Sequence, residues 1–165
     1  NLIITILKKE GLKLKSLKSV DKSFYFGSED YELIFKNNYY DKDDVSKGVS
    51  LLNNISKFDN AQSVVISNGY ILGIEATEGT DSLLKRVSFE KKKLKLNKRE
   101  GVLIKISKKN QSDLVDNPVI GPTTIKNAIK ANLNGIAIKK NDTIIFDKIK
   151  ILKMLKENKL NLYFV

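Results

Sequence analysis

The sequence has no cysteine and no histidine among its 165 residues. Without cysteine, disulfides and thiol catalysis are excluded within this chain, and without histidine so are Ser-His-Asp triads and Cys/His zinc sites. Acid–base or metal chemistry must therefore come from Asp, Glu, Lys, Tyr, Ser, Thr or a bound water. The oxygen ligands among these favour a hard ion such as magnesium or manganese.

Long apolar runs are missing as well. The longest cover only a few residues, such as 2–4 and 144–146, whereas a membrane-spanning helix needs about 20. No signal-peptide pattern is present either. Hydrophobic residues make up 41% and charged residues 30% of the chain, which is typical of one globular domain with its own core. The chain begins at Asn1 and runs directly into an apolar pattern, so we expect that an upstream part of the protein is missing from it.

Negative charge is scarce relative to positive charge. The 30 Lys and Arg residues against 19 Asp and Glu give a formal net charge of +11. This excess indicates an anionic partner, such as a phosphorylated substrate, nucleic acid or an acidic membrane surface. An AT-rich coding sequence explains it equally well, because only Arg86 and Arg99 are arginines. No nucleic-acid partner is expected, because the aromatic residues are not interleaved with basic ones in an RNA-binding signature.

Hydrophobic periodicity and turn residues predict a mixture of helices and strands. The predicted fold class is α/β, with α+β as the alternative, built as a mixed β-sheet with flanking helices. The basic run 91–99 is interpreted as a solvated loop or a frayed helix. Helices are expected at residues 2–7, 41–57, 79–87, 121–131 and 147–155, strands at 12–17, 101–106 and 160–165, and hairpins at 63–74, around Asn68-Gly69, and at 135–146, around residues 140–142.

The first candidate site lies at residues 73–81. Glu75, Glu78 and Asp81 surround Gly79 where a strand ends and a helix begins, and α/β folds often bind ligands at such a place. The helix amides there suit a phosphate, and the carboxylates suit a divalent cation that bridges to it. The alternative is that Thr80 or Asp81 only caps the helix.

The second candidate site covers residues 105–123. Lys105 and Lys108 can hold phosphate oxygens, while Asp113 and Asp116 can share a metal or divide metal binding from water activation. Residues 121–123, Gly-Pro-Thr, begin a helix whose amino terminus is a further anion site. The alternative is a polar loop with a turn-forming Asp-Asn-Pro.

These two segments resemble the LpxI family of UDP-2,3-diacylglucosamine pyrophosphatases. The resemblance runs from about residue 40 to the carboxyl terminus, with its motifs in the same order and at compatible spacing. The matching pieces are residues 75–81, 101–105, Lys108 with Gln111, 116–125, 127–128 and 133–137. The sequence departs from the family at Ser112 and Leu114, where the family has an aspartate and a basic residue.

The resemblance implies that this chain is a single domain of a two-domain enzyme. Residues 1–38 would be the connecting segment and the start of the domain, residues 39–165 would be the carboxyl-terminal catalytic domain, and an amino-terminal Rossmann-like domain would be absent from the chain. The family's reaction uses magnesium and attack of water on the α-phosphate of UDP-diacylglucosamine, giving UMP and lipid X in the lipid A biosynthesis of Gram-negative bacteria. The substrate is amphipathic, so a cytoplasmic location, peripheral at the inner face of the inner membrane, is expected. A homodimer is left open.

Transferred by motif, Asp116 is the expected catalytic residue and also a metal ligand, together with Glu75, Glu78 and Asp81. Two other classes of function remain open. One is a basic non-enzymatic module that binds nucleic acid or anionic lipid, and the other is a catalytically inactive relative that binds the substrate without cleaving it. The expected substrate-binding residues are Lys105, Lys108, Gln111, Thr80, Gly79, Gly121 and Thr123.

Overall fold

A five-stranded mixed sheet organises the domain in the computed structural model, which describes residues 2–27, 30, 41–58, 61–108, 114 and 116–165. The strand order is β2-β1-β3-β5-β7, and β4 and β6 form a separate two-stranded parallel sheet. This architecture confirms the predicted α/β class with a mixed sheet. The strands are β1 (Ser63–Ser67), β2 (Tyr70–Ile74), β3 (Val102–Lys105), β4 (Val119–Ile120), β5 (Gly135–Ile138), β6 (Ile144–Ile145) and β7 (Asn161–Phe164).

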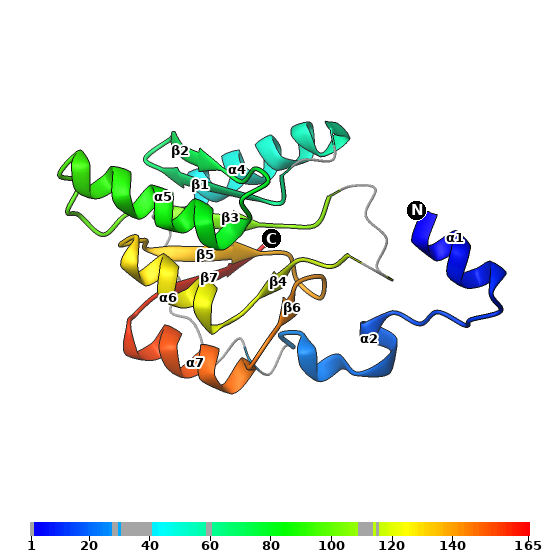
Figure 1. Cartoon of the computed structure of the whole chain (residues 1–165). Coiled ribbons are helices and arrows are strands. Elements are labelled where there is room, and N and C mark those ends of the chain that lie inside the picture. Colours follow the sequence, from blue (N-terminus) through cyan, green and yellow to red (C-terminus); the bar gives the residue numbers. More distant parts are fainter. Residues whose placement is uncertain (1, 28–29, 31–40, 59–60, 109–113, 115) are drawn as a thin grey trace.

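Helices cover both faces of the five-stranded sheet (Figure 1). Helix α4 packs on one face, and α5, α6 and α7 pack on the other. The amino-terminal helices α1 and α2 lie away from the sheet, on the side of β4 and β6 (Figure 1). Within the described part of the chain, no helix has the length and apolar character needed to cross a membrane. The helical elements are α1 (Leu2–Lys9), α2 (Leu17–Val20), η1 (Lys22–Phe24), α4 (Lys42–Ile55), η3 (Ser56–Phe58), α5 (Thr80–Lys93), α6 (Pro122–Lys130) and α7 (Lys148–Glu157).

The central strands are apolar on both faces because helices cover both. Side chains alternate across a strand, so Leu103 of β3 packs toward α5 and α6, whereas Val102 and Ile104 pack toward Leu52 of α4. All four side chains are at most 2% exposed. Such continuous apolar runs are typical of strands buried between two helical layers.

Most local predictions are confirmed. Helices occupy the five ranges predicted for them, and β1 and β2 form the hairpin around Asn68 and Gly69. Asn68 has a φ of 50° and Gly69 a φ of 79°, the left-handed region that asparagine and glycine tolerate best. The carboxylate of Asp44 accepts hydrogen bonds from both turn amides, at 2.8 and 2.7 Å. The turn is therefore fixed both by its own sequence and by α4.

The predicted second hairpin is wrong. Strand β5 lies in the centre of the sheet, parallel to β3 and β7, so both of its edges are already paired. The chain then leaves this sheet, and β6 pairs in parallel with β4 instead. Residues 140–142 are thus a turn out of the sheet rather than a hairpin loop.

The strand predicted at residues 12–17 is also wrong. Residues 12–16 are irregular, and α2 begins at Leu17, where the hydroxyl of Ser16 accepts a hydrogen bond from the Ser19 amide at 3.3 Å. Alternation alone does not make a strand, because backbone groups also need a neighbouring strand to pair with. In the basic run, α5 continues to Lys93, and Lys91 is buried rather than solvated.

The strand directions bring the candidate residues to one edge of the sheet. Strand β1 is antiparallel to β2 and β3, while β3, β5 and β7 are parallel. The carboxyl ends of β2, β3, β5 and β7 and the start of β1 therefore share one edge, which we call the carboxyl edge. The opposite edge, with the β1–β2 turn and the residues before β3, β5 and β7, is the amino edge. The predicted sites begin where β2 and β3 end, at the carboxyl edge.

Candidate active site at the carboxyl edge

Lys105 is the buried cation of the carboxyl edge. It is the last residue of β3, is 7% exposed, and points to the face that α5 covers. Its Nζ donates a hydrogen bond of 2.5 Å to the hydroxyl of Thr80, the first residue of α5. Burial lowers the pKa of Lys105, and the negative charges of Glu75 and Asp81 act in the opposite direction. The site thus holds an ammonium group largely away from water, where its charge acts strongly.

Thr80 connects this lysine to two further side chains. Its hydroxyl donates to a carboxylate oxygen of Glu75 at 2.9 Å and lies 3.0 Å from the hydroxyl of Ser63. A threonine hydroxyl has one hydrogen and two lone pairs. Since the hydrogen goes to Glu75, Thr80 accepts from Lys105 and from Ser63. Groups from β1, β3, the end of β2 and the start of α5 therefore form one network.

Asp81 adds a second carboxylate beside this network. It is the second residue of α5, and its Oδ1 is buried with no hydrogen-bond partner among the described residues. A buried carboxylate oxygen without a partner is costly, and such an atom in a native fold calls for a donor or a cation. The amino terminus of α5 has no side-chain cap, because Gly79, with a φ of 78°, occupies the N-cap position. Within the described part of the chain, the start of α5 therefore presents uncapped amides and one carboxylate oxygen without a donor.

Glu78 lies apart from this network. It is exposed and forms an ion pair of 2.7 Å with Arg86. The hydrogen bond from Arg86 lowers the pKa of Glu78. The same guanidinium also donates to the carbonyl of Ile74 at 3.0 Å. Glu78 is therefore already neutralised within the chain.

A second polar group follows β3 and β5. The hydroxyl of Ser107 donates to the carboxylate of Asp142, and Lys139 Nζ lies 3.8 Å from the same carboxylate. The side-chain amide of Asn117 donates to the Asp142 carbonyl at 3.2 Å. Asn117 directly follows Asp116, which is exposed. The segment that carries Asp116 is thus attached to the carboxyl ends of the two central parallel strands.

The remaining residues that the sequence predicted for the site have no described contact with the network around Lys105 and Thr80. Lys108 is half-buried beyond the end of β3, and Gln111 lies outside the described residues, as does Asp113. Gly121 is the N-cap residue of α6, which has no side-chain cap, and Thr123 is exposed in its first turn. In the described part of the chain, the amino terminus of α6 thus lacks a side-chain cap, and its role as an anion site stays a prediction.

The sequence analysis missed three residues of the site: Ser63, Ser107 and Asp142. Ser63 begins an antiparallel strand, and its place opposite Lys105 follows only from the pairing of β1 with β3. Asp142 was taken as part of a hairpin turn. The signal that could have found it is its place four residues after the apolar strand 135–138, because residues that follow parallel strands meet at one edge.

The described residues contain no group of three or more acidic side chains that could hold a metal ion. Glu75, Glu78, Asp81 and Asp116 thus do not form one preassembled metal centre. Magnesium commonly takes only one or two carboxylates and completes its shell with water and substrate phosphate. Glu75 and Asp81, which both act on Lys105, and the unpartnered Oδ1 of Asp81 fit that sparser arrangement.

The fold and the site together define a class: a mixed α/β domain that gathers carboxylates, hydroxyls and a buried lysine at the carboxyl ends of its strands, where α/β proteins bind phosphorylated ligands. The chain belongs to the LpxI C-terminal domain family, whose profile matches residues 35–163. This confirms the resemblance found in the sequence.

A curated relative is the UDP-2,3-diacylglucosamine pyrophosphatase LpxI of Caulobacter vibrioides (strain ATCC 19089 / CIP 103742 / CB 15). It is 36% identical over 107 residues, which are 64% of this chain and 38% of the relative. The matched region therefore spans well under half the length of that protein.

Proposed function

We propose that this domain is the catalytic half of a magnesium-dependent pyrophosphatase. Its reaction would be the hydrolysis of UDP-2,3-diacylglucosamine at the α-phosphate, giving UMP and 2,3-diacylglucosamine 1-phosphate, called lipid X. The observation that carries the proposal is the cluster of Lys105, Glu75 and Asp81 at the start of α5 in a domain of the LpxI family. A buried cation beside uncapped helix amides suits a diphosphate, which carries concentrated negative charge.

Lys105 and the backbone amide of Thr80, the first residue of α5, bind the phosphate oxygens in this mechanism. The ammonium group of Lys105 is preorganised by its hydrogen bond to Thr80, so little side-chain freedom remains to be lost when a ligand binds. Its charge counts for more at 7% exposure than it would in water, because the surrounding dielectric is low. The first amides of α5 supply further donors to the same anion.

Asp116 positions the attacking water and accepts one of its protons. The water oxygen forms the new bond to the α-phosphorus, and the bond from that phosphorus to the bridging oxygen breaks. The electron pair leaves with the sugar phosphate, and the proton passes from Asp116 to solvent. Magnesium held by one or two of the carboxylates of Asp116, Asp81 and Glu75 would supply the charge neutralisation that a diphosphate requires.

The rest of the proposal concerns the protein around this domain. A Rossmann-like amino-terminal domain would cover the carboxyl edge from the other side, and the whole protein would act in the cytoplasm, peripherally at the inner face of the inner membrane. The amphipathic substrate supports this location, because its acyl chains would remain close to the membrane while its diphosphate is cleaved.

The experiment is UMP release from UDP-2,3-diacylglucosamine by the intact protein, with and without magnesium. We expect Asp116→Ala to reduce turnover at least about 100-fold, the lower range for loss of a general base. The matched control is Asp43→Ala, which removes an exposed aspartate of α4 on the other face of the sheet. Unchanged turnover in Asp116→Ala would contradict the proposal.

Two further outcomes separate the alternatives. Substrate binding without UMP release would identify a catalytically inactive relative. Absence of both, with binding to nucleic acid or anionic lipid that weakens steeply with salt, would identify a basic binding module.

A further inference from the structure

The two groups of polar side chains at the carboxyl edge are connected through Asp142, which is 9% exposed. Its carboxylate accepts a hydrogen bond from the hydroxyl of Ser107, two residues beyond Lys105 at the end of β3. Two residues span at most about 7 Å, so this carboxylate is closely tied to the strand end that carries the buried lysine. Lys139 Nζ lies 3.8 Å from the same carboxylate, but the Lys139 side chain is 56% exposed and such a pair contributes little.

The backbone next to this carboxylate holds the segment that follows Asp116. The carbonyl of Asp142 accepts from the side-chain amide of Asn117 at 3.2 Å. The amide of Ile144 donates to the carbonyl of Pro118 at 2.8 Å, and the parallel pairing of β4 with β6 begins directly beyond this bond. Asp116 is exposed and directly precedes these two residues, so its position depends on theirs.

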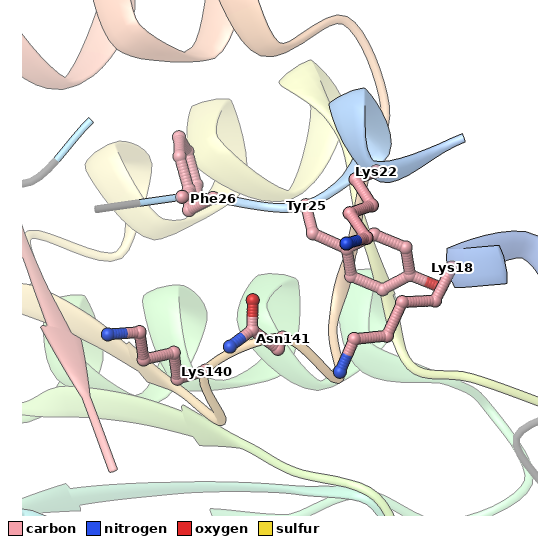
Figure 2. A pocket seen from close by; sticks show the side chains of 7 residues that line it. Lys18, Lys22, Tyr25, Phe26, Lys140 and Asn141 are labelled. Atoms are coloured by element: carbon pink, nitrogen blue, oxygen red, sulfur yellow. The ribbon is translucent and has the colours of Figure 1, made fainter. Parts of the chain in front are cut away.

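The turn that carries Asp142 is itself held in place. The Lys140 amide donates to the carbonyl of Val165, the residue after β7, at 3.4 Å. Asn141 has a φ of 58°, in the left-handed region that asparagine tolerates better than most residues. Figure 2 shows Lys140 and Asn141 lining a pocket together with residues of the amino-terminal segment. Asp142 therefore extends from a turn that is packed against other parts of the fold.

We propose that Asp142 is a positioning residue that holds Asp116 at a fixed place relative to Lys105. The roles of Asp116 and Lys105 rest on the proposed function, whereas the contacts of Asp142 do not. In that function Lys105 binds the diphosphate and Asp116 positions the attacking water, so their separation decides whether the water reaches phosphorus. A displacement of about 1 Å can lower a rate about 100-fold. Asp142 acts through Ser107 and Asn117 and not on the substrate itself.

Asp44 offers a matched control at the amino edge. It is 7% exposed, and its carboxylate accepts from the amides of Asn68 and Gly69 at 2.8 and 2.7 Å. Removing either aspartate leaves hydrogen-bond donors without their acceptor, so both alanine variants should lower the unfolding temperature. A purely structural role for Asp142 predicts that the two variants behave alike in every other respect.

The first test is UMP release by the intact protein and its variants. We expect Asp142→Ala to lower kcat about tenfold with little change in KM, because Lys105 and the amides of α5 still bind the diphosphate. Ser107→Ala should have the same effect, since it removes the same hydrogen bond from the other side. Asp142→Asn should retain most of kcat, because its side-chain oxygen still accepts from Ser107. Asp44→Ala should leave kcat per folded molecule unchanged.

The second test is hydrogen exchange of backbone amides, which reports the positioning without any turnover. We expect the Ile144 amide, which is bonded to Pro118, to exchange faster in Asp142→Ala and in Ser107→Ala. The reference is the Ile104 amide in the central strand β3. Faster exchange at Ile144 relative to Ile104 shows local release of the segment, whereas Asp44→Ala should change the two amides alike.

Three results would overturn the proposal. They are an unchanged kcat in Asp142→Ala, an equal loss of kcat in Asp44→Ala, and exchange at Ile144 that changes only in step with Ile104. The two proposals fail separately. If the unchanged protein released no UMP while exchange at Ile144 followed Asp142, only the proposed reaction would be lost. Turnover that depends on Asp116 and is indifferent to Asp142 would remove only the positioning role.

Discussion

Among the described residues, two lysines are buried, one at each edge of the sheet. Lys91 is 4% exposed and Lys105 is 7% exposed, and burial lowers the pKa of both. Lys91 donates to two backbone carbonyls, those of Glu100 and Asn132, at 2.9 and 3.0 Å. Lys105 donates to a side chain, Thr80, that is itself bonded to a carboxylate. The two lysines are thus similarly buried but bind different groups: Lys91 binds backbone carbonyls, and Lys105 belongs to a network of side chains.

At the amino edge, charged side chains donate hydrogen bonds to backbone carbonyls. Arg99 donates to the carbonyls of Leu133, Asn158 and Lys159, at 3.1, 2.7 and 3.0 Å. Carbonyls at the ends of helices lack partners within the helix, so cations that reach them stabilise the fold. At the carboxyl edge the charged side chains bond mainly to side-chain hydroxyls, and Oδ1 of Asp81 has no partner among the described residues. The amino edge therefore uses its cations to hold backbone carbonyls, whereas the carboxyl edge is the part to which the proposed function assigns ligand binding.

The largest expected effect is on turnover at the carboxyl edge. Lys105→Met keeps the length of the side chain and removes the charge, so we expect UMP release by the intact protein to fall about 100-fold through lost phosphate stabilisation. Steady-state kinetics measures this, and the circular dichroism spectrum should remain that of the unchanged protein. A variant that turns over normally would break the assignment of this edge to catalysis.

The corresponding change at the amino edge should affect stability instead. Lys91→Met removes the ammonium donor from the carbonyls of Glu100 and Asn132, although the Asn132 carbonyl still accepts from the Glu100 amide at 3.2 Å, and we expect a cost of about 2 kcal/mol of unfolding free energy. Urea unfolding measures this loss. Turnover per folded molecule should not change, and a specific loss of turnover at full folding would show that the two edges are not functionally separate.

A smaller effect is expected at the β1–β2 turn. Gly69 has a φ of 79°, so Gly69→Ala should cost about 1 kcal/mol through backbone strain alone, because nothing lies near the added Cβ. Gly11→Ala is a matched control for a left-handed glycine that lies away from the sheet, with a φ of 76° and equally open space. The unfolding temperature of the sheet should fall in Gly69→Ala and should not change in Gly11→Ala.

The smallest effect is a pH dependence. The pKa of Lys91 is below its ordinary value of 10.5 in the folded protein, so between the two values the unfolded chain binds more protons. The contribution of Lys91 to the free energy of unfolding should therefore increase as the pH rises from the folded pKa to the ordinary pKa. The difference in unfolding free energy between the unchanged protein and Lys91→Met should grow as the pH rises toward 10.5. A difference that shrinks would contradict the direction of the pKa shift.

Sequence patterns predicted the elements whose signals are local. The Asn68-Gly69 turn and the capping Asp147, which accepts from the Lys150 amide at 3.3 Å, depend only on neighbouring residues. Strand pairing depends on distant residues, and the wrong strand prediction and the wrong hairpin prediction both concerned it. The pattern at residues 12–17 had no neighbouring strand to join, and the pattern at 135–146 was assigned to the nearest strand in sequence instead of to β3 and β7.

Only part of the site was predictable, because local signals identify single residues but not their long-range contacts. Lys105, Thr80 and Glu75 were found because they follow strands or begin a helix, and their contacts with one another appear only in the fold. Asp142 and Ser63 reach the carboxyl edge through long-range pairing, which no local pattern encodes. At the amino edge, Lys91 and Arg99 looked like members of a solvated basic run, and their carbonyl partners lie more than 30 residues away for all but one contact.

The most direct test of the difference between the two edges follows both lysines in one experiment. The side-chain Nζ resonances of Lys91 and Lys105 would be observed by nuclear magnetic resonance while UMP and magnesium are added to the intact protein, with Lys91→Met and Lys105→Met used for assignment. We predict that the Lys105 resonance shifts with saturation and that the Lys91 resonance stays in place. A Lys105 resonance that ignores the nucleotide, or a Lys91 resonance that follows it equally, would contradict the account.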